Sequence, residues 1–89
     1  MSELLIVKPS QILRETRQQQ CKIGFSDGNR LCAFSVLMYK LGWNGDDNNR
    51  QSFWKSVEQL IGMNAGCIFA MNTKHSFSEI ADWLEEKGL

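Results

Sequence analysis

Proline, histidine and any surplus of one charge are almost absent from this sequence. It has one Pro and one His in 89 residues, and ten Lys/Arg balance ten Asp/Glu. A chain this poor in proline, without low-complexity tracts, is not a linker. A nucleic-acid-binding domain normally carries a basic surplus that neutralises phosphates. We therefore do not expect nucleic-acid binding, for which the available cations would be Arg14, Arg17, Lys22 and Arg30.

Paired cysteines are also missing. Cys21, Cys32 and Cys67 are odd in number and form no C-x-x-C pair. A disulfide framework needs an even number of cysteines, and structural zinc sites usually contain cysteine pairs. We therefore expect reduced thiols, no metal site and no cofactor. Cys67 is predicted to lie in the core and Cys21 to be half-buried.

Long hydrophobic runs are absent as well. The apolar run Leu4–Val7 is too short for the hydrophobic part of a signal peptide or for a membrane span. It could form a strand or an extended lead-in to the first helix. The sequence predicts a cytoplasmic protein that does not associate with membranes.

The sequence does contain enough apolar residues for a core. Hydrophobic residues make up 43% of the chain, and its length suits one domain, residues 1–89. Residues 1–45 contain six Lys/Arg and three Asp/Glu, whereas residues 46–89 contain four and seven. We expect the basic first helix and the acidic last helix to complement each other within that domain.

Hydrophobic spacing predicts the first half of the fold. Pro9 suits the first turn of a helix, and an amphipathic helix is expected over residues 9–20. The Asp27-Gly28 pair lies between two short segments of residues 22–32 and indicates a β-hairpin. Residues 32–41 are apolar on almost every side, which predicts a buried central helix ended by Gly42.

The second half is predicted to contain two further helices and one short element. Residues 51–61 have helical spacing and are followed by Gly62, a residue typical of helix ends. The apolar residues 65–71 fit either a helical turn or a buried strand, because periodicity does not separate the two over so short a run. Ser76 and Glu79 have the spacing of a capping box at the start of a last helix that reaches Lys87.

These elements predict a mostly α (α+β) domain with four to five helices around a buried central helix and one short hairpin. The central helix should pack between the first and last helices. The expected core residues are Ile12, Leu13, Leu31, Cys32, Val36, Leu37, Leu41, Val57, Leu60, Ile68, Phe77, Ile80, Ala81 and Leu84.

Three motifs in a fixed order resemble a family of small bacterial and phage-associated domains of unknown function. The motifs are D-G-x-x-L-C-A-F-S (27–35), F-A-M-N (69–72) and S-F-x-E-I-A-D-W-L-E (76–85). The resemblance covers about residues 10–87. Ser35 and Val36 depart from the small residues of the family, and Thr73 stands where the family often has Asp. The resemblance implies the helical architecture and no named activity.

One candidate site consists of Cys32 and His75. Cys32 opens the central helix, and a helix N-terminus stabilises a thiolate, which is a nucleophile. His75, the sole histidine, would act as its base, oriented by Asn72 or Asp82. This arrangement would make the protein a thiol enzyme, either a hydrolase or an acyl transferase. The alternative is that Cys32 is a small core residue and His75 a solvated turn residue.

A second candidate site is a protein-binding surface. Trp43 and Trp54 flank the polar loop 44–49, and Arg50 lies between them. Exposed Trp and Arg dominate the binding energy of many protein interfaces. The alternative is that both rings cover the edge of a small core. The sequence thus favours a non-enzymatic binding or adaptor domain that binds a protein partner or self-associates as a homodimer.

Overall fold

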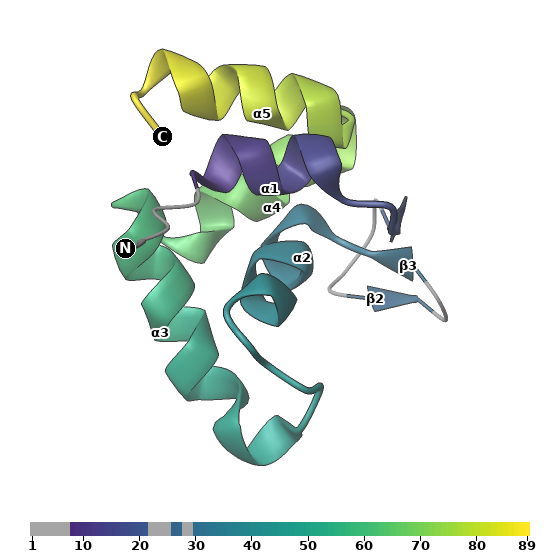
Figure 1. Cartoon of the computed structure of the whole chain (residues 1–89), viewed down its shortest axis with the longest axis vertical. Coiled ribbons are helices and arrows are strands. Elements are labelled where there is room, and N and C mark those ends of the chain that lie inside the picture. Colours follow the sequence, from purple (N-terminus) through teal and green to yellow (C-terminus); the bar gives the residue numbers. More distant parts are fainter. Residues whose placement is uncertain (1–7, 22–25, 28–29) are drawn as a thin grey trace, which may run out of the picture.

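The computed structural model describes residues 8–21, 26–27 and 30–89 (Figure 1). These residues contain five α-helices, one 3-10 turn and three two-residue strands. In chain order the elements are α1 (Pro9–Glu15), β1 (Gln19–Gln20), β2 (Ser26–Asp27), β3 (Arg30–Leu31), α2 (Ala33–Lys40), η1 (Asp47–Asn49), α3 (Arg50–Ile61), α4 (Ala65–Lys74) and α5 (Phe77–Glu86). The predicted mostly α class is confirmed.

Helix α2 is the centre of the domain. All residues from Ala33 to Met38 are buried, as the apolar run predicted. The helix packs chiefly against α1, α3 and α4, and the small sheet lies on the side of α2 opposite α3 (Figure 1). The predicted position of α2 between the first and last helices is wrong, because α5 packs mainly on α1.

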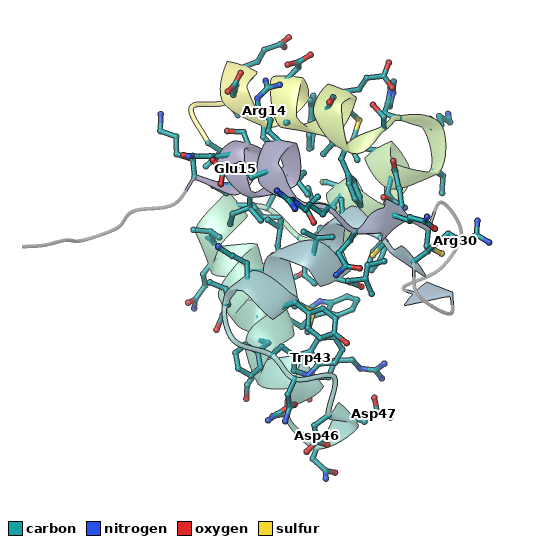
Figure 2. All side chains as sticks on the ribbon, turned by 45° about the vertical axis from the view of Figure 1, so that its right-hand side comes forward. Arg14, Glu15, Arg30, Trp43, Asp46 and Asp47 are labelled. Carbon is teal, nitrogen blue, oxygen red and sulfur yellow. The ribbon has the colours of Figure 1, made fainter. Side chains whose placement is uncertain are left out.

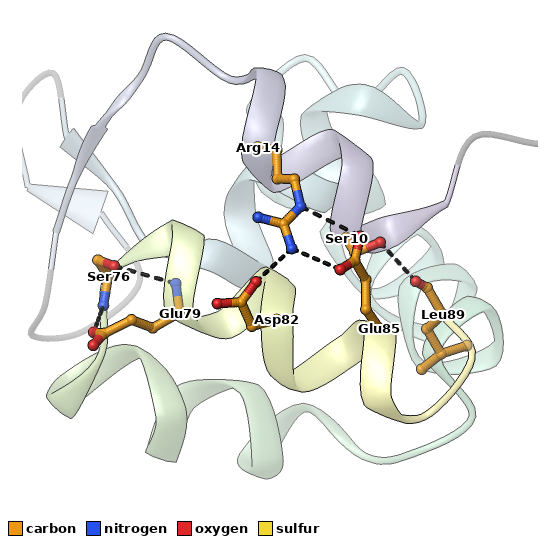
Figure 3. Close-up of polar contacts among 7 residues, drawn as sticks. All are labelled: Ser10, Arg14, Ser76, Glu79, Asp82, Glu85 and Leu89. Carbon is orange, nitrogen blue, oxygen red and sulfur yellow. Dashed lines mark hydrogen bonds and ion pairs between the residues drawn. The ribbon is translucent and has the colours of Figure 1, made fainter.

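Ion pairs connect the surfaces of helices α1 and α5 (Figure 3). Arg14 Nη2 lies 2.5 Å from Asp82 Oδ1 and 2.7 Å from Glu85 Oε1. The hydrogen bonds to Glu85 and then to Asp82 raise the pKa of Arg14, which therefore stays charged. Ser10 Oγ donates to the Leu89 carbonyl at 2.7 Å. The expected complementarity of the first and last helices is confirmed.

The start of α5 has the predicted capping box (Figure 3). Ser76 Oγ accepts a hydrogen bond from the Glu79 amide at 3.2 Å, and Glu79 Oε1 accepts one from the Ser76 amide at 2.9 Å. Two amides that the helix itself leaves unpaired are thereby satisfied.

The three strands form one small sheet in the order β1-β3-β2. Strands β2 and β3 are antiparallel with Asp27 opposite Arg30, which confirms a hairpin. Strand β1 adds a parallel neighbour that was not predicted, with Gln19 opposite Arg30. Lys22–Phe25 and Gly28 of the predicted hairpin, and the run Leu4–Val7, lie outside the described residues.

The first helix is shorter than predicted. It ends at Glu15, and Thr16 is already extended, although Ile12 and Leu13 are buried as expected. Gln20 instead pairs with Leu31 in the sheet. Tertiary hydrogen bonds therefore override the helical spacing of residues 16–20. In contrast, the ambiguous apolar element proves to be helical and extends to Lys74.

The carboxamide of Asn72 connects the sheet, α2 and α4. The side chain is 1% exposed. Its Nδ2 donates to the Cys21 carbonyl at 2.6 Å, and its Oδ1 accepts from the Ala33 amide at 3.0 Å. Gln20 Nε2 donates to Asn72 Oδ1 at 3.0 Å and to the His75 carbonyl at 2.7 Å. Asn72 therefore fixes the chain that enters α2 against α4.

Several predicted core residues are less buried than expected. Leu41 is 41% exposed because α2 ends at Lys40, and the chain then turns so that Trp43 takes the inner position. Three others are only half-buried at the margin of the core, namely Leu31, Leu60 and Phe77. The remaining ten expected core residues are buried.

Two cysteine predictions are also wrong. Cys67 is exposed, because the inward side of α4 consists of Ala65, Ile68 and Asn72. Cys21 is 4% exposed rather than half-buried, because it lies between the sheet and α4, where its amide donates to the Leu31 carbonyl at 2.9 Å.

Candidate functional site

Cys32 caps the N-terminus of α2 from a fully buried position. Its Sγ accepts a hydrogen bond from the Ser35 amide at 3.4 Å and lies 3.3 Å from Ser35 Oγ. Burial raises the pKa of the Cys32 thiol, although the contacts with Ser35 act in the opposite direction. The thiol is therefore protonated at neutral pH, and its contribution to stability declines above about pH 8.5, where the unfolded chain ionises first.

His75 follows α4 and faces a different partner. Its side chain is 41% exposed, and its Nδ1 lies 3.7 Å from Glu79 Oε1. Within the residues that the structure describes, no hydrogen bond connects His75 to Cys32. The two groups expected to orient the imidazole are occupied elsewhere, Asn72 at the entry to α2 and Asp82 on Arg14. In the described part of the chain, Cys32 and His75 are therefore not joined as the expected catalytic pair.

The burial of the cysteines predicts their reactivity. Native protein treated with iodoacetamide at neutral pH is expected to be alkylated at Cys67, while Cys21 and Cys32 react at least about 100-fold more slowly, because they become accessible only when the structure opens. Peptide mass spectrometry reads each site separately, and a urea-unfolded sample is the control for intrinsic reactivity. Fast alkylation of native Cys32 would contradict the protonated, buried thiol.

Trp43 is not exposed as the binding-surface hypothesis expected. It is 5% exposed, with its ring centroid 4.8 Å from that of Tyr39. Its Nε1 donates to the Asp46 carbonyl at 3.0 Å, at the base of the loop that η1 closes (Figure 2). Trp43 is therefore a core residue that anchors this loop.

Trp54 and Arg50, the other two predicted binding residues, line one groove between α3 and α4. The groove has a volume of about 780 Å³. Six of its lining residues belong to η1 and α3, and one belongs to α4; they are Asp47, Arg50, Gln51, Trp54, Lys55, Glu58 and Phe69. The structure thus brings together two of the three predicted binding residues and places the third in the core.

A cluster of three tilted aromatic rings forms the apolar centre of the groove. The half-buried Trp54 ring lies 4.7 Å from the buried Phe34 ring and 5.4 Å from the half-buried Phe69 ring, between centroids. Phe34 and Phe69 are 5.5 Å apart. Phe34 thus supports both half-exposed rings from below, so the groove presents a preformed aromatic surface.

Charged side chains flank these rings. Arg50 Nη1 lies 3.8 Å from Asp47 Oδ1, in a pair that is largely exposed. On the other side of Trp54, Glu58 Oε2 accepts a hydrogen bond from the Ala65 amide at 2.7 Å at the start of α4. A cation and a carboxylate therefore stand one helical turn to either side of the tryptophan.

Sequence reasoning missed Phe69 and Glu58. Phe69 could not be placed while residues 65–71 were open to two conformations. Glu58 could have been found, because residues 50, 54 and 58 recur every four positions and share one face of a helix.

No cluster of three or more His, Cys, Asp or Glu side chains suited to a metal ion occurs in the described part of the chain. Within residues 8–21, 26–27 and 30–89, no helix is both long and apolar enough to cross a membrane. Comparison of the chain with protein-family models, curated proteins and solved structures gives no match. The resemblance to the family of small bacterial and phage-associated domains therefore stays a prediction.

Proposed function

We propose that this chain is a cytoplasmic, non-enzymatic protein-interaction domain whose binding surface is the groove between α3 and α4. The observation that carries the proposal is the cluster of aromatic rings at its centre, in which Trp54 is half-buried against Phe34 and Phe69. A rigid tryptophan beside an arginine is typical of the residues that dominate binding energy at interfaces.

The charged side chains of the groove indicate which side chains a partner would carry. Arg50 lies one turn before Trp54 and Glu58 one turn after it. A complementary helix would carry an apolar side chain opposite Trp54, a carboxylate opposite Arg50 and a cation opposite Glu58. We propose that the partner presents an amphipathic helix of this kind.

The thiol-enzyme alternative has less support. A nucleophilic cysteine needs an accessible thiolate. Cys32 is buried, burial raises the pKa of its thiol, and within the described residues no hydrogen bond joins it to His75. Nucleic-acid binding has little support either, because Arg14 is neutralised by Asp82 and Glu85.

Site-specific photo-crosslinking tests the proposal. A photoreactive amino acid replaces Gln51, an exposed residue of the groove, and the control position is Ser78, which is exposed on α5. Crosslinks formed in cells are mapped to peptides by mass spectrometry. We expect products from position 51 that map to a helix with the stated charge pattern and decrease at least about tenfold with Trp54→Ala, the loss typical of a hot-spot residue.

Two outcomes would contradict the proposed binding surface. One is a yield from position 51 no higher than from position 78. The other is a set of products that persists unchanged with Trp54→Ala. The variant must stay folded for this comparison, which its far-ultraviolet circular dichroism verifies.

A further inference from the structure

We infer that the helix recognised by this groove is α3 of a second copy of the same chain, packed antiparallel about a two-fold axis near Trp54. The inference rests on the proposed function, because it names the partner of the same groove. Its basis is that α3 itself has the charge pattern that the groove requires.

The spacing on α3 is symmetric about Trp54. Arg50 and Glu58 each lie four residues away, so each stands about 6 Å from Trp54 along the helix axis and on the same face. A two-fold axis at Trp54 reverses the order of this strip in the second copy. Arg50 then faces Glu58 of the other copy twice, with the two tryptophans between these pairs.

Other arrangements of the same strip are electrostatically worse. Parallel helices would place Arg50 opposite Arg50 and Glu58 opposite Glu58. An antiparallel pair shifted by one helical turn in either direction would place Trp54 opposite Arg50 or Glu58 and would lose both Arg50–Glu58 pairs. Like charges placed opposite each other are unfavourable, so the register centred on Trp54 is preferred.

The groups that would form these pairs are suitably placed. The Ala65 amide occupies Glu58 Oε2, so Oε1 can accept a further hydrogen bond. Arg50 has a side chain that is 49% exposed and a guanidinium with five donor hydrogens, which can contact both Asp47 and a second carboxylate. Phe69 lies beside Trp54 and enlarges the apolar centre that the second tryptophan would contact.

Sedimentation equilibrium of the purified full chain tests this inference. The wild type is expected to show a monomer–dimer equilibrium between about 10 µM and 1 mM at low salt, and added NaCl should raise the dissociation constant. Trp54→Ala should raise it at least about 30-fold. The matched control is Trp83→Ala, which removes a half-buried tryptophan from α5. This variant should change the dissociation constant less than about threefold.

If Trp54→Ala unfolds, variants with reversed charges at residues 50 and 58 test the proposed dimer instead. Arg50→Glu should raise the dissociation constant at least about tenfold, and adding Glu58→Arg in the same chain should restore it to within about threefold. A wild type that stays monomeric up to about 1 mM, or equal effects of the two tryptophan variants, overturns the inference. So does a double variant that does not recover dimerisation although its circular dichroism and urea stability match those of the wild type, which shows that loss of the bond between Glu58 and the Ala65 amide has not disturbed α3 and α4.

The crosslinking experiment distinguishes failure of the proposed self-association from failure of the proposed protein-binding function. A monomeric purified chain that nevertheless forms Trp54-dependent crosslinks to a different protein leaves the proposed function standing and refutes only self-association. A monomeric chain without such crosslinks refutes both.

Discussion

Asn72→Ala is expected to lower the free energy of unfolding by about 3 kcal/mol. The substitution removes the buried carboxamide to which the Cys21 carbonyl and the Ala33 amide are hydrogen-bonded. Loss of a hydrogen bond to a buried group costs about 1–3 kcal/mol, which is a large part of the total stability of a domain of this size. The loss is measured by urea denaturation followed by circular dichroism.

Thr73→Ala is the matched control for this prediction. Thr73 is the next residue of α4, is exposed, and donates within its own helix to the Ala70 carbonyl at 2.8 Å. Its replacement should change the stability by less than about 0.5 kcal/mol. Equal effects of the two substitutions would show that the buried carboxamide does not join the sheet, α2 and α4 as described.

Phe34→Ala is expected to cost about 4 kcal/mol, because it empties a fully buried site beneath the groove. The same change removes the support of Trp54 and Phe69, whose centroids lie 4.7 and 5.5 Å from that of Phe34. We therefore expect a red-shifted tryptophan emission and a weaker near-ultraviolet circular dichroism signal at temperatures where the variant is still folded.

The half-buried Phe53 on α3 provides the comparison. Phe53→Ala should cost less, about 1–2 kcal/mol, because less apolar surface is lost from the core. A loss for Phe34→Ala no greater than that for Phe53→Ala would contradict the role of Phe34 as the buried support of the Trp54 and Phe69 rings.

The sequence predicted those parts of the fold that local signals determine. The capping box of Ser76 and Glu79, the apolar run of α2 and the Gly62 that ends α3 depend on residues close in the chain. Residues 16–20 were predicted wrongly, because Gln20 obtains its hydrogen bonds from residues more than 50 positions away. Such partners are not visible in a helical pattern.

The candidate site was only partly predictable for the same reason. Trp54 and Arg50 are four residues apart on one helix, so their shared face follows from the spacing. The burial of Trp43 depends on the turn after α2, in which the Trp43 amide donates to the Met38 carbonyl. The position of Phe69 depends on the packing of α4, which brings its ring next to that of Trp54. Both are tertiary features that residue types alone do not specify.

The proposed dimer joins the strip of Arg50, Trp54 and Glu58 to the same strip of a second copy in an antiparallel register. Mixing two single variants tests it most directly. Arg50→Glu alone and Glu58→Arg alone should each be monomeric, because each places like charges opposite each other at both ends of the strip. Mixed in equal amounts, they should form a heterodimer about as stable as the wild-type dimer, since both pairs are then opposite in sign. Native mass spectrometry with one variant isotopically labelled distinguishes the mixed dimer from the homodimers. A mixed dimer beside a dimeric wild type supports the antiparallel register, because parallel helices would repel each other in the wild type. A mixture that stays monomeric at concentrations where the wild type dimerises contradicts it.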